Sequence, residues 1–346
     1  MKDKVLVPKN NKDHIILAIE TSCDETSVAV IRGSREVLSN IVSSQIDIHK
    51  KYGGVVPEIA SRHHLDNINM IIKEGMDTAG ITFEEIDLIG VTCGPGLVGA
   101  LLIGIAAAKA LSYVLKVPIV GVHHIEGHIC ANYLEHADLK PPFLGLVVSG
   151  GHTHILDVLD YNNYNILGRT RDDAVGEAFD KVARVIGLGY PGGPLIDRLA
   201  LSGDPEAISF PRIYLEHDSF DFSFSGIKTA VLNYINSEKQ KNNAINKADV
   251  AASFQKAVMD VIIEKTCKAA KKAERDTVVV AGGVAANSFL RKMLKEKCGE
   301  MGIRVFFPSL DLCTDNAAMI GCAAYHNYMA GKVDNLYLDA NPNLKL

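Results

Sequence analysis

The amino-acid sequence predicts an α/β protein with two lobes of related design. Apolar segments with strand-like and helix-like patterns alternate along the chain, which is typical of this class. Residues 14–32 and 143–160 are each an apolar run broken by a short polar turn, and they start 129 residues apart (14 to 143). Their similarity indicates an internal duplication of one strand–turn–strand unit.

A third apolar run, residues 277–290, contains a Gly-Gly turn and is predicted to open a helix near Ala285. Glycine turns let backbone N–H groups approach a bound anion closely, and a helix that starts beyond the turn adds its positive end. Together with the duplicated units, this turn predicts a nucleotide-binding protein.

Strands and helices are predicted in chain order from the apolar pattern and the bounding turns. The strands are expected at residues 14–20, 26–32, 87–92, 118–122, 143–149, 154–160, 277–281 and 303–307. The helices are expected at residues 57–79, 97–116, 123–136, 173–187, 192–202, 225–237, 247–275, 285–299 and 314–331. The polar segment 237–247 is expected to be a surface connection.

Two consecutive prolines, Pro141 and Pro142, follow a polar stretch and predict the boundary between the lobes. We expect an N-terminal lobe over residues 14–140, with the helix 314–331 packed on it. A C-terminal lobe is expected over 141–313, and a loose tail over 332–346.

Composition limits the class of protein. The chain has 346 residues, of which 47% are hydrophobic and 22% charged, as in soluble globular proteins. Its net charge of −5 argues against tight nucleic-acid binding by the chain alone. Residues 264–300 differ, because nine Lys or Arg and five Asp or Glu give them a net charge of +4. A solvated helix face explains that excess equally well.

The cysteines and the N-terminus indicate the compartment. Seven cysteines are scattered without a C-x-x-C pair, which suits a reducing environment. The first 14 residues lack the apolar segment of a secretory signal. Residues 97–117 are apolar enough to span a bilayer, but Lys109 and many small residues favour a buried helix of a soluble protein. We therefore expect a cytoplasmic protein.

The sharpest local signal is the segment HHIEGHI at residues 123–129. His124 and His128 are four residues apart, so on a helix they share one face, as metal ligands do. Glu126 lies about 200° around the helix from His124, so a metallopeptidase would lack its catalytic base. Asp315 is the best candidate for a third ligand, although it could simply cap a helix. A histidine pair of this spacing is also common without a metal.

A second group of polar residues is acidic. Asp173, Glu177 and Asp180 follow at helical spacings and precede the turn Tyr190-Pro-Gly-Gly-Pro194. Carboxylates near a glycine turn can accept hydrogen bonds from the hydroxyls of a ligand. A solvated acidic helix face is the alternative.

In combination, these motifs closely resemble those of one family. The chain contains AIETSCDETSVAV, HHIEGH, VSGGHT, GEAFDK, YPGGP, FSFSGIKTAV, AGGVAANSFLR and TDNAAMI in this order. They resemble the TsaD family, the tRNA adenosine threonylcarbamoyltransferases formerly described as glycoproteases. The resemblance extends over about residues 15–330, and the SCDET and VAANS forms are typical of its bacterial members. Residues 1–13 precede it and are given no role.

The resemblance implies a fold and a reaction. The fold is that of actin, Hsp70 and sugar kinases, in which each lobe is a ribonuclease H-like sheet with helices. The reaction moves the threonylcarbamoyl group from threonylcarbamoyl-AMP to the exocyclic amine of the adenosine 3′ of the anticodon, and AMP leaves. The tRNAs are those that read codons beginning with adenine.

The resemblance also implies roles for particular residues. A divalent metal, either Fe²⁺ or Zn²⁺ with Fe²⁺ preferred, would be held by His124, His128 and Asp315. Asp24 and Glu25 would line the site and orient the amine. The acyl-phosphate portion would be received at the turn formed by Val147, Val148, Ser149, Gly150 and Gly151. The nucleotide would be held by Asp180, Gly193, Asp197 and Asn287.

Partners and alternatives complete the expectations. Bacterial members of the family work with a shorter paralogous subunit (TsaB-like) and a small P-loop ATPase (TsaE-like). An ATP-dependent phosphotransferase of the same fold, a metallopeptidase and a non-catalytic nucleotide-binding scaffold are the alternatives. The phosphotransferase and the scaffold leave the histidine pair unexplained.

Overall fold

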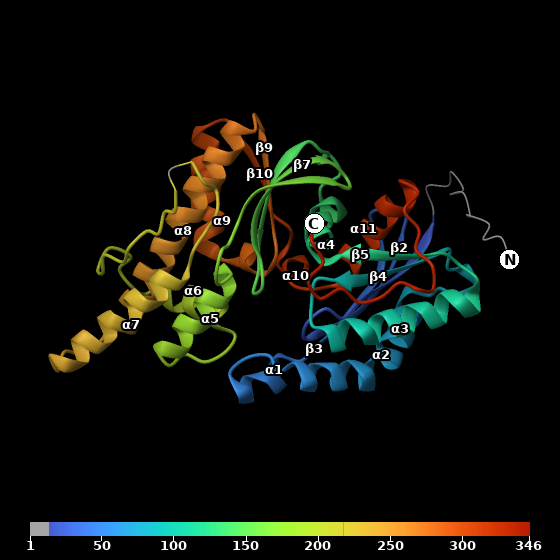
Figure 1. Cartoon of the computed structure of the whole chain (residues 1–346), viewed down its shortest axis with the longest axis horizontal. Helices are drawn as coiled ribbons and strands as arrows, with labels where there is room; N and C mark the ends of the chain where they lie inside the picture. Colours follow the sequence, from blue (N-terminus) through green and yellow to red (C-terminus); the bar gives the residue numbers. More distant parts are fainter. Residues whose placement is uncertain (1–13, 217) are drawn as a thin grey trace. The chain divides into compact units, whose positions relative to one another are not determined.

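The computed structural model describes residues 14–216 and 218–346 (Figure 1). The role of residues 1–13 therefore lies outside the described residues. The contacts divide the chain into two compact units. Unit 1 comprises the chain up to Lys140 together with Thr314–Leu346, and unit 2 comprises Pro141–Cys313.

Unit 1 is built on a five-stranded sheet with the order β3-β2-β1-β4-β5. The first three strands are antiparallel neighbours, and β4 and β5 run parallel to β1. The strands are β1 (Ile15–Glu20), β2 (Glu25–Arg32), β3 (Glu36–Ser44), β4 (Leu88–Gly94) and β5 (Ile119–His123).

Unit 2 repeats this topology with the order β10-β9-β6-β7-β8. Again three antiparallel strands are followed by two strands parallel to the first. The strands are β6 (Phe143–Val148), β7 (Thr153–Asp160), β8 (Asn163–Arg169), β9 (Thr277–Ala281) and β10 (Arg304–Phe306). The predicted duplication and the α/β class are thus confirmed.

Helices cover both faces of the sheet in unit 1. One face packs on α2 (Pro57–Ala79) and α3 (Val98–Leu115), and Leu17 and Ile19 of β1 point to this side. The other face packs on α11 (Ala317–Met329), which also contacts α4 (His124–Glu135). Because side chains alternate along a strand, Ala18 and Glu20 belong to the α11 side. The remaining helical turns are α1 (Ile46–His49) and two 3₁₀ turns, Lys50–Tyr52 and Phe83–Glu85.

The core of unit 2 lies between its sheet and a helical layer. The long helix α8 (Lys247–Lys272) contributes most of its buried face to this core. The other helices are α5 (Val175–Val185), α6 (Gly192–Ala200), α7 (Ser225–Gln240), α9 (Ser288–Glu300) and α10 (Leu310–Cys313), with a 3₁₀ turn at Gly283–Ala286.

Two strands were absent from the prediction. β3 and β8 are the outer strands of their antiparallel triplets, and several of their side chains are exposed. Neither has the continuous apolar run by which a buried strand is recognised. The helix expected near Ala285 was also wrong, because a 3₁₀ turn comes first and α9 begins at Ser288. Asn287 fixes that start, since its side chain accepts a hydrogen bond from the backbone of Leu290 at 2.9 Å.

The C-terminal segment is not the loose tail that was expected. Asp334 pairs with Ile119 at the edge of β5, and its carboxylate accepts a bond from the Gly121 backbone at 2.7 Å. Further along, the Asn341 backbone donates to the carbonyl of Cys93 at 2.8 Å. Gly94 permits this approach, since a Cβ there would lie 2.0 Å from the Asn341 oxygen. Backbone bonds to β4 and β5 therefore attach the segment to unit 1.

Helix α3 is only partly buried. In the described part of the chain it is the one helix long and apolar enough to cross a membrane by length and composition, and 33% of that window is buried. Leu101, Gly104 and Ile105 face the core, while Tyr113 and Val114 are 71% and 72% exposed. The helix that was expected to be buried is therefore buried on one face only.

Candidate functional site

Unit 1 brings together three side chains that can share a cation. His124 and His128 lie one turn apart on α4, and Asp315 stands two residues before α11. Oδ1 of Asp315 is 3.5 Å from Nε2 of His124 and 3.3 Å from Nε2 of His128. In the part of the chain that the structure describes, this is the group of His, Cys, Asp and Glu side chains found able to hold a metal ion.

The two separations between Asp315 and the histidines suit metal ligands. An ion bound about 2.1 Å from each ligand atom with tetrahedral angles would hold those atoms about 3.4 Å apart, close to the two separations above. His128 is 1% exposed, and neither of its ring nitrogens has a hydrogen-bond partner among the described residues. Buried polar atoms are normally satisfied. The site therefore fits a cation held by two nitrogens and one carboxylate, with coordination positions left open.

A buried carboxylate lies behind the first histidine. Oε2 of Glu20, at the end of β1, is 3.1 Å from Nδ1 of His124. The same oxygen accepts a bond from the hydroxyl of Thr92 at 2.6 Å, and the other oxygen accepts one from the backbone of Ser22 at 2.5 Å. Burial raises the pKa of Glu20, but the charge and hydrogen bond of His124, together with the bond from Ser22, bring the pKa below its usual value.

The carboxylates make this corner of unit 1 favourable for positive charge. Burial lowers the pKa of His124, but Asp315 and Glu20 raise it more, to about 9. The same accumulation of negative charge disfavours the ionised form of Glu25. Desolvation, together with the Asp24 and Asp315 carboxylates, holds the pKa of Glu25 well above its usual range.

The turn that carries Asp24 and Glu25 is held by α2. His64 of that helix is fully buried, and its ring nitrogens lie 2.8 Å from the Thr26 hydroxyl and 2.9 Å from the Cys23 carbonyl. Glu25 accepts a bond from the Ser44 hydroxyl of β3 at 3.1 Å. The turn is thus fixed from two elements beside the cluster.

Glu126 does not join the three-residue cluster, although it lies between the two histidines in sequence. Its side chain is 6% exposed and accepts a bond from Asn327 of α11 at 3.1 Å. This contact on another face of α4 agrees with the rotation of about 200° around the helix that separates Glu126 from His124. Asn327 thus ties this carboxylate to the helix packed on α4.

In unit 2, the residues expected around the acyl-phosphate form a tight turn after β6. Val147 and Val148 are fully buried in the strand, and Ser149 closes the turn by backbone bonding with His152 at 2.8 Å. Around Gly150 and Gly151 there is open space, since a Cβ at either would meet nothing within 4 Å. The N-terminal turn of α5 lies against this segment, and a Cβ on Gly176 would come 2.7 Å from the Ser149 oxygen.

The residues expected at the nucleotide lie on α5, α6 and the start of α9. Asp180 accepts a bond from the Gly192 backbone at 2.6 Å and so fixes the start of α6. Asp197 accepts bonds from the Asn287 amide at 3.1 Å and from the Ser288 backbone at 3.0 Å. Gly193 borders open space. The structure brings Asp197 and Asn287 into contact and gives Asp180 a capping role.

Several residues at these sites were not expected from the sequence. They are Glu20, Ser22, Thr92 and His64 in unit 1, and Gln255 and Ser288 in unit 2. Gln255 accepts a bond from Asn287 at 2.7 Å. Only Glu20 could have been noticed from the sequence, because it ends the apolar run 15–19 and a buried charge requires partners.

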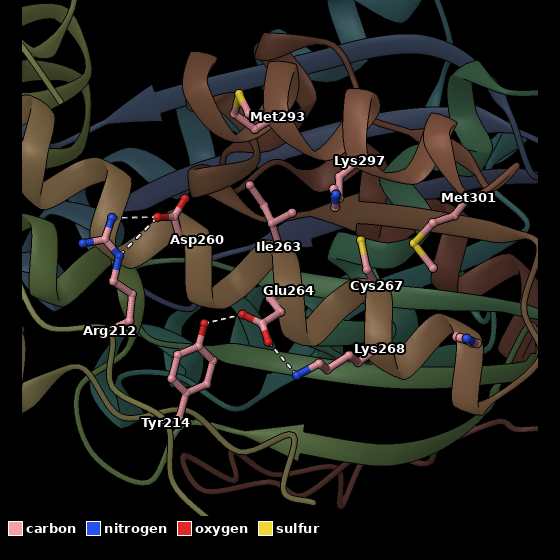
Figure 2. A pocket seen from close by; sticks show the side chains of 11 residues that line it. Arg212, Tyr214, Asp260, Ile263, Glu264, Cys267, Lys268, Met293, Lys297 and Met301 are labelled. Atoms are coloured by element: carbon pink, nitrogen blue, oxygen red, sulfur yellow. Dashed lines mark hydrogen bonds and ion pairs between the residues drawn. The ribbon is translucent and has the colours of Figure 1, made fainter. Parts of the chain in front are cut away.

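Unit 2 also contains a groove between α8, α9 and the segment before α7 (Figure 2). Its volume is about 600 Å³. Ile263, Cys267, Met293 and Met301 form its apolar part. Arg212 bonds to Asp260 at 2.8 Å, Lys268 bonds to Glu264, and Lys297 pairs with Glu300 at 2.8 Å. Lys271 also lines the groove. Cations therefore outnumber anions around the apolar part.

Comparisons with known proteins agree on one family. A family model for tRNA N6-adenosine threonylcarbamoyltransferase, TsaD, matches residues 36–322. A protein of that name from Clostridioides difficile is 59% identical over 334 residues, which cover 96% of this chain and 99% of the relative. Another from Clostridium perfringens is 59% identical over 332 residues, which cover 96% and 98%.

Solved structures with low sequence identity share the fold. HypF of T. kodakarensis has a TM-score of 0.63 at 15% identity, over 93% of this chain and 48% of HypF. The activator of the 2-hydroxyisocaproyl-CoA dehydratase from Clostridium difficile has a TM-score of 0.51 at 12% identity, over 93% and 98%. These similarities concern architecture, and they agree with an actin-like fold of two related units.

Proposed function

The chain belongs to the tRNA N6-adenosine threonylcarbamoyltransferase (TsaD) family, and we propose that it takes the threonylcarbamoyl group from threonylcarbamoyl-AMP. It is a transferase that modifies tRNA. In the proposed reaction the exocyclic amine of the adenosine 3′ of the anticodon attacks the acyl carbon, and AMP leaves. The substrates are tRNAs that read codons beginning with adenine. The cluster of His124, His128 and Asp315 is the observation that supports this chemistry most directly.

We assign these three residues to one divalent metal ion, Fe²⁺ in preference to Zn²⁺. Two imidazoles and a carboxylate with open positions are compatible with either metal. When bound, such an ion supplies Lewis acidity and a fixed point for orienting an oxygen of the acyl donor.

The residues around the cluster have separate tasks in this proposal. Asp24 and Glu25 orient the adenosine amine, which is a weak nucleophile and gains most from being placed correctly. Desolvation and the neighbouring Asp24 and Asp315 carboxylates raise the pKa of Glu25, which favours the protonated form of this carboxyl group. AMP is a good leaving group, so the reaction needs little further acid catalysis.

In unit 2 we assign the acyl-adenylate to the glycine turn and to the carboxylates beyond it. The open backbone at Gly150 and Gly151 leaves N–H groups available for phosphate or carbamoyl oxygens. Oδ1 of Asp197 accepts bonds from the Asn287 amide and the Ser288 hydroxyl, and Oδ2 accepts one from the Ser288 backbone. The carboxylate still has a lone pair for a ribose hydroxyl. Open space above Gly193 is consistent with a sugar at this position.

The metallopeptidase alternative lacks support from the position of Glu126. A peptidase of that type needs the carboxylate beside the metal to activate water. The contact of Glu126 with Asn327 instead explains this residue as a structural link between α4 and α11.

We infer three macromolecular partners in the cytoplasm. The tRNA backbone would contact the groove in unit 2, where Lys271 has no ion-pair partner among the described residues. It would also contact Lys272, the next residue on α8, whose ammonium lies 5.3 Å from the centre of the Phe220 ring. A shorter TsaB-like subunit would dock on the exposed apolar side chains of α2 and α3, which include Leu65, Met70, Tyr113 and Val114. A small TsaE-like ATPase would complete the system.

A reconstituted assay tests the proposal. Metal-loaded, untagged protein is mixed with threonylcarbamoyl-AMP, unmodified tRNA and the two partner proteins, and the nucleosides are analysed by mass spectrometry. Threonylcarbamoyladenosine and an equal amount of AMP are expected. Release of AMP without the modified nucleoside would contradict the transfer, and ATP consumption with phosphoryl transfer would indicate the phosphotransferase instead.

A further inference from the structure

We propose that Glu20 is a positioning residue that sets the orientation and the tautomer of His124 for metal binding. The inference rests on the proposed metal site, because Glu20 itself is not among the three ligands. Its carboxylate lies 3.1 Å from Nδ1 of His124, on the side of the ring opposite the nitrogen that faces Asp315.

The tautomer follows from the donors and acceptors around the ring. Glu20 is fully buried, and both of its oxygens act as acceptors, one for the Ser22 backbone N–H and the other for the Thr92 hydroxyl. With this acceptor beside it, Nδ1 of His124 carries the proton that is shared with Glu20, and the Ser22 hydroxyl, 3.2 Å from the same nitrogen, can accept from it as well. In the neutral ring Nε2 then carries the lone pair. That lone pair points to the cluster, where Oδ1 of Asp315 is 3.5 Å away. A ligating histidine whose other N–H is fixed by a carboxylate has this arrangement.

Glu20 is itself held in place by other elements of unit 1. The Thr92 hydroxyl on the neighbouring strand β4 donates to it at 2.6 Å, and the Ser22 backbone donates at 2.5 Å. Register places Thr92 beside Glu20, since the preceding pair in the parallel ladder is Ile19 with Val91. The two strands thus orient the carboxylate before any ligand is present.

His128 provides an internal contrast. Both of its ring nitrogens lack hydrogen-bond partners among the described residues, so no comparable acceptor fixes its tautomer. Of the two histidines, His124 is therefore the one whose coordinating atom is determined in advance.

The test is the affinity of the metal-free protein for Zn²⁺, measured by competition with a chromophoric chelator. Glu20→Gln should weaken binding roughly ten- to hundredfold, as expected when the partner of a ligating histidine is removed. Glu126→Gln is the matched control, because it neutralises a second buried glutamate, one that accepts a hydrogen bond from Asn327 of α11. It should bind Zn²⁺ within about twofold of the wild type.

A second measurement separates positioning from folding. In the Zn²⁺-loaded protein labelled with ¹⁵N-histidine, the shifts of His124 should show a protonated Nδ1 and a metal-bound Nε2. In Glu20→Gln the Nδ1 proton should exchange faster. Thr92→Val should cause a smaller loss of affinity, and Thr92→Ser, which keeps the hydroxyl, should restore it.

The outcomes are distinguishable. If His128→Ala binds Zn²⁺ as tightly as the wild type, the metal site itself is wrong. If His128→Ala loses the metal while Glu20→Gln keeps wild-type affinity, the site stands and the positioning role is overturned. If Glu20→Gln unfolds, the Thr92 pair decides, and equal affinity of Thr92→Val and Thr92→Ser also overturns it.

Discussion

His128 illustrates how much of the candidate site depends on single side chains. It is almost completely buried, yet neither ring nitrogen is satisfied by the described residues. Unsatisfied buried polar groups destabilise a fold, so a residue of this kind is retained for a reason other than stability. In the proposed enzyme, the role of His128 as a metal ligand supplies that reason.

Replacing His128 by alanine should remove bound metal and abolish tRNA modification while the protein stays folded. Loss of an unsatisfied imidazole costs little hydrogen-bonding energy, although a small cavity remains. Metal content of untagged protein, circular dichroism and the nucleoside assay are the measurements. A His128→Ala protein with full metal and full activity would show that the ligand assignment is wrong.

Glu126→Gln should leave the rate of tRNA modification within a few-fold of the wild type. Its amide can still accept from Asn327, and the carboxylate is not needed at the cluster. A hydrolase that used Glu126 as general base would instead lose roughly 10²–10⁴ in rate. Metal-dependent cleavage of a glycoprotein by the wild type, abolished in this variant, would favour the peptidase.

At the scale of elements, α2 controls the turn between β1 and β2 through His64. Burial lowers the pKa of this histidine, so the folded protein keeps it neutral while it contacts Thr26 and Cys23. In the unfolded chain the pKa returns to about 6.5. As pH falls below that value the unfolded state binds more protons, so this contribution to stability is present above it and is lost in acid.

The free energy of unfolding should therefore fall between pH 7 and pH 5, with His64 contributing at most about 1.4 kcal/mol per pH unit. Urea unfolding at several pH values measures the slope. In His64→Gln the slope should be shallower, because one neutral buried histidine has been removed. His63→Gln, which changes the half-buried neighbour on the same helix, should keep a slope close to that of the wild type. Equal slopes in all three proteins would exclude the role of His64.

The sequence allowed the central strands, the long helices and the duplication to be predicted, because burial on both faces leaves a continuous apolar pattern. β3 and β8 were missed, since their order comes from pairing with a neighbour rather than from their own composition. The histidine pair could be found from its i,i+4 spacing. Glu20 could not be connected with His124, because the two are 104 residues apart and meet only after the strands pair.

At the scale of the whole molecule, the net charge of −5 limits unaided binding to tRNA. The isolated chain should bind tRNA weakly at physiological salt, more tightly with its partner proteins, and less tightly as salt is added. Filter binding over a range of salt concentrations is the measurement. Tight, salt-insensitive binding by the chain alone would contradict the requirement for partners.

Lys271→Glu combined with Lys272→Glu should weaken tRNA binding and make its salt dependence shallower, by about one to two units of the logarithmic slope. The affinity for the acyl-adenylate should not change, since that site uses the glycine turn. Lys50→Glu with Lys51→Glu is the matched control, because both of these lysines are exposed on unit 1. Equal effects of the two double variants would mean that general charge, and not the groove, sets the affinity.

The interrupted path of unit 1 has a consequence for biosynthesis. Unit 2 is one continuous stretch of chain, whereas unit 1 needs α11 from beyond residue 313 to cover one face of its sheet. On the ribosome, His124 and His128 emerge long before Asp315, so the nascent chain carries two of the three proposed ligands and an uncovered apolar sheet face until translation is nearly complete. Unit 2 can fold first, although its sequence comes second. A polypeptide released early lacks Asp315, the third proposed ligand, so in the proposed enzyme metal loading would indicate that synthesis had reached the last helix.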